Sequence, residues 1–290
     1  MIRQFIGTVA CLLVATVAVA QNESTTKVYE ALKKALDSGR EVRIDLNTDD
    51  NEYLGKIDAL TEAEVTITSK ASSFTFQLSN IASVMIVDPG NKESRWFKNR
   101  TRNRLFITQT ALSNGAGTGY YQNIYIFLSN ISYSPTNFLT VSAGFSNIPR
   151  LTLDGDFFIL SAKLNTPIAA GFNLGVSGTM FAVSKETAGY VNLLGTYTYK
   201  SLDLSAGLGA GVAEGETSEA VAVFGFQYRF GPRIALVTEN FRIPGLDGVL
   251  YSFGPRFIGK RMSADLGLFG STESEDAAFL VPYVSFSVAF

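Results

Sequence analysis

The sequence contains no histidine, and its only cysteine is Cys11, close to the N-terminus. An imidazole normally takes the proton from a serine nucleophile near neutral pH, and histidine and cysteine are the usual zinc ligands. The 290-residue chain therefore lacks the side chains for serine–histidine hydrolysis and for a conventional zinc site. We predict that the protein is not an enzyme and has no metal or other cofactor.

Long apolar runs are also scarce. Beyond the first 20 residues no stretch reaches the ~18 consecutive apolar residues of a transmembrane helix, although hydrophobic residues make up 46% of the sequence. The formal net charge is only −2, so no nucleic-acid partner is expected. Apolar residues that are dispersed in alternation favour strands over membrane helices.

The N-terminus has the features of a targeting segment. Arg3 precedes an apolar run over residues 5–20, and Ala18-Val19-Ala20 has the small-x-small pattern of a cleavage site. This predicts a signal peptide over residues 1–20, with a membrane anchor helix as the alternative, for which the run is short. Cleavage after Ala20 would leave a mature chain without cysteine, and hence without disulfides.

The last eleven residues, Leu280–Phe290, alternate with period two, which predicts a strand. Pro282, Val284, Phe286, Val288 and Phe290 share one bulky apolar face, and Tyr283, Ser285 and Ser287 lie on the other. The pattern resembles the closing strand of Gram-negative outer-membrane proteins. That resemblance implies an outer-membrane location, contact with outer-membrane lipid, and an assembly signal read by the barrel-assembly machinery. The residues implied in the signal are Tyr283, Phe286, Val288 and Phe290.

Residues 104–290 contain about twelve strand-like runs. They begin near Leu105, Asn123, Asn137, Phe157, Gly171, Tyr190, Ser201, Glu219, Arg233, Val249, Met262 and Phe279. The predicted fold class is all-β: a transmembrane antiparallel β-barrel of about twelve strands, preceded by a small domain of one helix and a small β-barrel. A soluble lipocalin-like barrel or sandwich is the alternative.

The connections between these runs alternate in length. Short ones are expected at Pro135-Thr136, Asn165-Thr166-Pro167, Lys200-Ser201, Gly231-Pro232 and Gly259-Lys260-Arg261. Longer or more polar ones are expected at residues 113–119 and 271–276. Short turns on one side and longer loops on the other are typical of outer-membrane barrels, with both termini in the periplasm.

Residues 21–94 predict a small periplasmic domain. Val28, Ala31, Leu32, Ala35 and Leu36 form an apolar stripe in a helix expected over residues 27–38, and about five short strands follow. The order of elements and the segment Asn80–Asp88 resemble a small Sm-like barrel. We expect this domain to bind a periplasmic protein partner.

A basic linker is predicted over residues 95–103, and five of the ten residues from 95 to 104 are basic. Arginine side chains next to aromatic ones are typical of the lipid–water interface. The residues expected there are Trp96, Phe97, Arg100, Arg102 and Arg104. An ordinary solvated linker is the alternative.

Several charges fall on faces that should point into the barrel, because a charge facing lipid is expensive. They are Lys163, Lys200, Asp203, Arg229, Glu239, Arg256 and Asp265. Two interpretations stay open: the polar lining of a pore, or an internal salt-bridge network that plugs a narrow barrel. The leading functional prediction is a narrow passive channel for small solutes or ions, and the alternative is a closed barrel that anchors the periplasmic domain.

Overall fold

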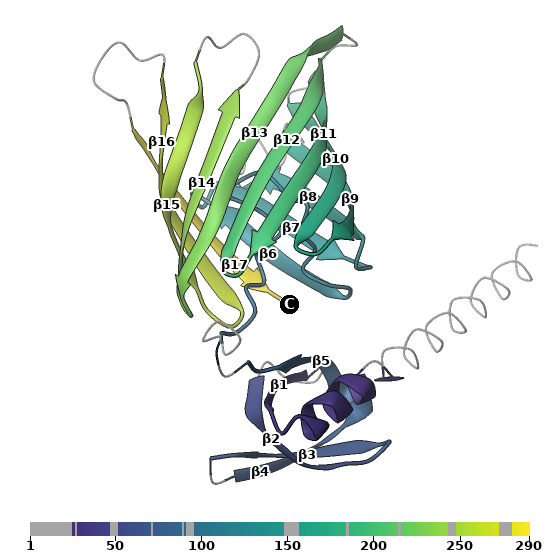
Figure 1. The fold of residues 1–290 in the computed structure, drawn as a ribbon. Coiled ribbons are helices and arrows are strands. Elements are labelled where there is room, and N and C mark those ends of the chain that lie inside the picture. The colour runs from purple at the N-terminus through teal and green to yellow at the C-terminus, as the bar shows by residue number, and fades with distance from the viewer. Residues whose placement is uncertain are drawn as a thin grey trace, which may run out of the picture. The chain divides into compact units, whose positions relative to one another are not determined.

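The computed structural model describes residues 25–26, 28–46, 52–70, 72–88, 90, 96–147, 157–183, 186–213, 216–242, 248–272 and 280–290 (Figure 1). The chain divides into two compact units at the boundary between Phe97 and Lys98. The predicted signal peptide, residues 1–20, lies outside the described residues. In the described parts of the chain, no helix is both long enough and apolar enough to span a membrane.

The first unit contains a helix over residues 28–37 and one five-stranded antiparallel sheet. Its strands are β1 (Glu41–Leu46), β2 (Glu52–Leu60), β3 (Glu64–Ser69), β4 (Ser72–Gln77) and β5 (Ile81–Ile86). The order in the sheet is β4-β3-β2-β1-β5, so β4 and β5 are its edges. A short 3₁₀ turn, Leu78–Asn80, connects them.

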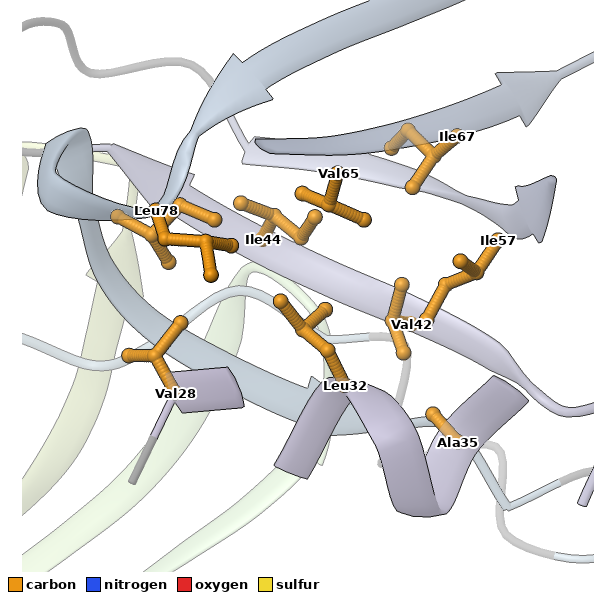
Figure 2. Close-up of a cluster of buried hydrophobic side chains, with 10 residues drawn as sticks. Val28, Leu32, Ala35, Val42, Ile44, Ile57, Val65, Ile67 and Leu78 are labelled. Carbon is orange, nitrogen blue, oxygen red and sulfur yellow. The ribbon is translucent and has the colours of Figure 1, made fainter. Parts of the chain in front are cut away.

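The helix covers one face of this sheet. Val28, Leu32 and Ala35 recur at helical spacing and point toward the strands, where Val42 and Ile44 of β1 are fully buried (Figure 2). Ile57, Val65, Ile67, Leu78 and Ile81 complete the cluster. Burial of each such side chain stabilises the domain by about 1.5–3 kcal/mol, so this unit has a core of its own.

The second unit contains a closed barrel of twelve antiparallel strands, as the sequence predicts (Figure 1). The first six are β6 (Thr118–Ile124), β7 (Leu128–Ser134), β8 (Leu139–Ser146), β9 (Phe157–Ala169), β10 (Phe172–Val183) and β11 (Glu186–Tyr199). The others are β12 (Leu202–Ala213), β13 (Glu216–Gly231), β14 (Ile234–Arg242), β15 (Leu250–Ile258), β16 (Met262–Ser271) and β17 (Val281–Ala289). The predicted closing strand, β17, pairs with β6 and completes the barrel.

The barrel is apolar outside and polar inside. On β12, Leu204 and Leu208 are 45% and 66% exposed, whereas Asp203, next to Leu204, is only 4% exposed. The same alternation exposes Phe224 on β13 and Phe257 on β15. A water-soluble barrel has the reverse arrangement, so the structure favours the transmembrane fold over the lipocalin-like alternative.

The strand boundaries agree with the predictions except at the start of the barrel, at β11, which begins at Glu186 and not near Tyr190, and at one turn. The first strand begins at Thr118, not near Leu105, and the second begins at Leu128, not near Asn123. The segment Asn165–Pro167, predicted as a turn, lies within β9, and Ala170-Gly171 forms that turn. Residues 113–119 are not an outer loop between two barrel strands, because residues 113–117 precede the first strand of the barrel and residues 118–119 lie in β6 itself. The reason for the late start is that the preceding residues fill the barrel.

Candidate functional site: a segment inside the barrel

Residues 98–117 fold into the barrel lumen, and we call them the lumen segment. Leu105 N–H donates to Thr108 O at 2.9 Å and Thr110 N–H donates to Asn103 O at 2.9 Å, which makes a tight hairpin. Arg104 and Phe106 are 2% and 0% exposed. The hairpin is short and its polar groups bond mainly to side chains of the barrel wall, so the segment is not a wall strand.

Glu239 of β14 holds the tip of this hairpin. Its carboxylate accepts hydrogen bonds from the backbone N–H groups of Phe106, Ile107 and Thr108 at 2.9, 2.8 and 2.6 Å. The Thr108 hydroxyl donates to the same carboxylate. Glu239 is fully buried. Hydrogen bonds to a charged acceptor contribute about 1.5–3 kcal/mol each, so this contact fixes the position of the hairpin.

A buried ionic cluster holds the base of the hairpin. Arg104 Nη1 donates to Asp265 Oδ2 at 2.8 Å, and Arg256 Nε donates to Asp265 Oδ1 at 2.6 Å. Ser285 Oγ donates to Asp265 at 2.9 Å, and Arg104 Nη2 donates to Ser287 Oγ at 2.8 Å. One carboxylate of the wall therefore joins a guanidinium of the wall to a guanidinium of the segment.

Arg256 also binds the segment through its backbone. Its Nη1 donates to Thr101 O at 3.2 Å and to Arg104 O at 3.1 Å, and its Nη2 donates to Leu105 O. Gln227 Oε1 on β13 accepts a further bond from Nη1 at 2.7 Å. A buried charge is tolerated only when it is paired and hydrogen-bonded, and the segment supplies much of that pairing.

Two more charged side chains of the wall bind the segment on either side of the hairpin. Lys163 of β9 donates to Thr110 O at 2.8 Å and to Leu112 O at 2.6 Å. Asp203 of β12 accepts a hydrogen bond from Arg102 Nε at 2.7 Å. The lumen segment is thus attached to strands β9, β12, β14, β15 and β16.

The apolar residues of the hairpin pack where the wall has glycines. A Cβ at Gly267 of β16 would lie 3.2 Å from the Phe106 ring, and one at Gly225 of β13 would lie 2.8 Å from Leu105 Cδ1. Phe106 also contacts Tyr283, with ring centroids 5.2 Å apart. These glycines let the hairpin approach the wall backbone closely.

The predicted lumen charges divide into two groups. Lys163, Asp203, Glu239, Arg256 and Asp265 are buried and bind the lumen segment. Lys200 instead lies in the exposed β11–β12 turn, over the Tyr199 ring. Arg229 donates to the carbonyls of Gly231 and Pro232 in its own hairpin. The role of these residues as pore lining stays a prediction.

The prediction of a lipid interface is wrong for Arg102 and Arg104. Their guanidinium groups point into the barrel and bind Asp203 and Asp265, because a carboxylate buried in the lumen needs a paired counter-charge. Arg100 is half-buried and its carbonyl accepts a bond from Asn114. In the first unit, Trp96 and Phe97 are half-buried, and the Trp96 carbonyl accepts a bond from Arg43. For these last three residues the interface stays a prediction.

The predicted assembly-signal residues lie on both faces of β17. Phe286 and Phe290 are exposed on the outer face, together with the half-buried Val288. Tyr283 is buried inside, where its hydroxyl donates to Phe106 O at 3.0 Å. Tyr283 therefore has a structural role inside the barrel, and recognition of the strand by assembly machinery stays a prediction.

A cavity of about 730 Å³ lies in the lumen beside the hairpin tip. Ile107 and Gln109 of the lumen segment form part of its surface, together with inward side chains of the wall such as Ile159, Phe181 and Tyr283. Among the described residues, no group of three or more Asp, Glu, His or Cys side chains is placed to hold a metal ion. The binding features of the lumen are therefore the segment contacts and this cavity.

The sequence pattern does not indicate the uncharged wall residues that bind the lumen segment. Thr196 Oγ1 accepts from Ala111 N–H at 2.9 Å, and Gln109 Nε2 donates to Ser161 Oγ at 3.1 Å. The available signal was the run Thr101–Thr110, which has no period-two alternation and contains two arginines. An inward-facing glycine such as Gly267 was a second signal, since small wall residues leave room for a neighbour.

Comparisons with known proteins give distant similarities. The sequence matches no protein-family model and no curated protein. A solved KdgM porin aligns with a TM-score of 0.46 at 9% identity, over 60% of this chain and 98% of that one. A loop L8 deletion mutant of OmpT, an outer membrane protein of Vibrio cholerae, aligns with a TM-score of 0.35 at 9% identity, over 87% and 96% of the two chains. A bacterial polysaccharide outer membrane secretin aligns with a TM-score of 0.34 at 13% identity, over 86% and 97%. The barrel fold described above rests on its own strand pairing.

Proposed function

We propose that this protein is an outer-membrane β-barrel that anchors its N-terminal domain in the periplasm. In this proposal the lumen segment of the same chain closes the barrel to steady solute flow. One observation carries the proposal: the buried Arg104–Asp265–Arg256 cluster joins the segment to the wall inside the lumen. The apolar outer face supports insertion in a membrane, because large side chains such as Leu208 and Phe224 are exposed there.

Closure is favoured over an open pore by the way the lumen charges are satisfied. In a water-filled pore, charged side chains of the wall are solvated. Here Lys163, Glu239 and Arg256 are each fully buried, and backbone groups of the lumen segment take up their hydrogen bonds. Removing the segment would leave these charges unpaired until water replaced it, so the closed state is the stable one.

The proposal is tested by locating the full chain and measuring solute entry. The mature protein should fractionate with the outer membrane and migrate differently on gels before and after boiling. Liposomes that contain it should swell in isotonic arabinose no faster than empty liposomes. Recovery in the soluble fraction would contradict the membrane assignment, and rapid swelling with wild-type protein would contradict closure.

The small unit is the part of the chain that a partner would recognise in this proposal. Its helix followed by five short strands is the element order expected for an Sm-like module, and its core is separate from the barrel. We expect deletion of residues 21–94 to leave a barrel that assembles and shifts on gels. A deletion mutant that keeps full function in cells would contradict the anchoring role.

A gated passive channel for small solutes or ions is the second candidate, and the lumen cavity of about 730 Å³ favours it. In this case displacement of the lumen segment opens the barrel, and the charges released from it, together with Arg229, line the pore. Replacement of Arg229 and Arg256 by neutral residues should then shift the cation-to-anion ratio of the open state. An unchanged ratio would remove these two residues from the pore lining.

A further inference from the structure

We propose that the lumen cavity binds the alkyl chain of an amphiphile without net charge, which enters over the short β6–β7 hairpin; this rests on the proposed membrane location of the barrel. The cavity lies next to the lumen segment and is separate from the ionic contacts that hold it. Four observations support the inference: the chemistry of the cavity lining, the height of the barrel wall, the apolar tip of the β6–β7 hairpin and an unpaired amide oxygen.

The lining of the cavity suits a hydrocarbon chain. None of the described residues that line it is charged, although the lumen nearby is rich in charge. Its aliphatic residues are Ile107, Ile124, Leu128, Ile159, Leu250 and Val281. A volume of about 730 Å³ is within the ~300–1,000 Å³ usual for small-molecule sites, which are mainly apolar with a few polar groups.

The barrel wall is low beside this cavity. Strands β6 and β7 have 7 residues each, whereas β9 to β13 have 12 to 16 (Figure 1). Seven residues extend ~23 Å along the strand at about 3.3 Å each, and tilt reduces the height further. A membrane barrel needs an apolar band ~25 Å tall, so a lipid chain can reach over this hairpin.

The tip of the β6–β7 hairpin is apolar, and its backbone has an unfavourable conformation. Phe127 N–H donates to Ile124 O at 3.1 Å, and the two residues between them, Tyr125 and Ile126, have φ of 53° and 69°. Such turns normally use Asn-Gly, because a β-branched residue at positive φ is strained. Ile126 is 79% exposed and Phe127 is 58% exposed. An exposed apolar tip with this strain suits contact with lipid at the cavity entrance.

Gln109 provides a polar group for the head of such a ligand. Its Nε2 donates to Ser161 Oγ at 3.1 Å, while its buried Oε1 has no hydrogen-bond partner among the described residues. Gln109 lines the cavity. A buried unpaired acceptor is unfavourable, and a rotation of the Gln109 amide would turn this oxygen toward a hydroxyl of the bound amphiphile.

The test uses tryptophan fluorescence and brominated alkyl chains, which quench on contact. Trp96 is the only tryptophan and is first replaced by Phe. Phe181→Trp then places a reporter in the cavity, and Leu160→Trp places one on the outer face. Each full-length variant is reconstituted in bilayers of phosphatidylcholine with plain or brominated chains. In a second arm, a terminally brominated dodecanol is titrated into plain bilayers.

The proposal predicts at least a twofold loss of Phe181→Trp fluorescence in one of these arms. Quenching by brominated lipid identifies a bilayer chain as the source, and saturable quenching by the dodecanol alone identifies a free amphiphile. Adding Ser142→Phe, which fills the cavity from β8, should restore the fluorescence.

The outcomes separate this inference from the proposed function. If Leu160→Trp is quenched by brominated lipid and Phe181→Trp is quenched in neither arm, the barrel is in the membrane and the cavity proposal is overturned. If Leu160→Trp is not quenched by brominated lipid in a variant that shows the gel shift on boiling, the membrane assignment itself fails. Quenching of Phe181→Trp that Ser142→Phe leaves unchanged also overturns the cavity site.

Discussion

Arg104 and Asp265, which are 161 positions apart in the sequence, form a buried ion pair with 2.8 Å between Nη1 and Oδ2. Arg104 precedes the first strand of the barrel and Asp265 lies on β16. Asp265 is also bonded to Arg256, so it balances two guanidinium groups. This pair ties the lumen segment to the wall of the barrel.

Asp265→Asn should loosen the lumen segment. The change leaves Arg104 and Arg256 without their shared counter-charge, and removing one partner of a buried ion pair costs about 3–5 kcal/mol. We expect the rate of trypsin cleavage after Arg104, measured by mass spectrometry on reconstituted protein, to rise roughly a hundredfold or more.

Lys200→Gln is the matched control for this change. It also removes one charge, but Lys200 is exposed in the β11–β12 turn. Its cleavage rate after Arg104 should equal that of the wild type. Equal rates in Asp265→Asn and wild type would show that the ion pair does not hold the segment.

Glu239→Gln should free the tip of the hairpin. The carboxylate accepts from three consecutive backbone N–H groups, and an amide NH₂ cannot accept in their place. We expect hydrogen exchange at Phe106, Ile107 and Thr108 to accelerate at least about tenfold, because one bond to a charged group is worth ~1.5–3 kcal/mol. Unchanged protection of these amides, with the rest of the barrel also unchanged, would contradict the role of Glu239.

Gly267→Leu should push the hairpin off the wall. A Cβ at Gly267 already lies 3.2 Å from Phe106 Cζ, so a larger side chain displaces the ring. Liposomes with this variant should swell faster in arabinose than those with wild type. Gly178→Leu is the control, because a Cβ there meets no atom within 4 Å. Equal swelling for the two variants would contradict close packing of Phe106 on β16.

Cysteines at residues 111 and 175 should form a disulfide. The Ala111 Cβ lies 3.6 Å from the Cβ position at Gly175, close to the ~3.8 Å of natural disulfides. A Cβ at Gly175 also comes within 2.9 Å of Leu164 O, so β10 must move slightly. The double variant should show no free thiol until it is reduced.

Ala111→Cys with Gly178→Cys is the control pair. Gly178 is on the same strand, but nothing lies within 4 Å of its Cβ position. This pair should keep two free thiols in the mature protein. Free thiols in the 111/175 pair as well would show that the segment does not lie against β10.

The barrel was predictable from local alternation, because each strand repeats with period two. That alternation places Asp203 on the opposite face from Leu204, and it places Asp265 and Glu239 inside, as the structure confirms. The turns between the strands were less predictable. Asn165–Pro167 has turn-forming residues but lies within β9, since pairing with Asn173–Gly175 of β10 outweighs local preference.

The lumen segment was not predictable from local pattern. Leu105, Phe106 and Ile107 form an apolar run that is compatible with a strand, and nothing near them in sequence indicates Glu239 as their partner. The internal salt-bridge network was one of two interpretations of the inward charges. Only long-range pairing, such as that of Arg104 with Asp265, distinguishes it from a pore lining.

Closure of the barrel by the lumen segment is tested most directly by single-channel conductance in a planar bilayer. The comparison is between wild type and a variant in which residues 99–116 are replaced by a Gly-Ser sequence of equal length, both checked for the gel shift on boiling. We predict that wild type shows no steady conductance and that the variant conducts. Steady wild-type conductance equal to that of the variant would contradict the account.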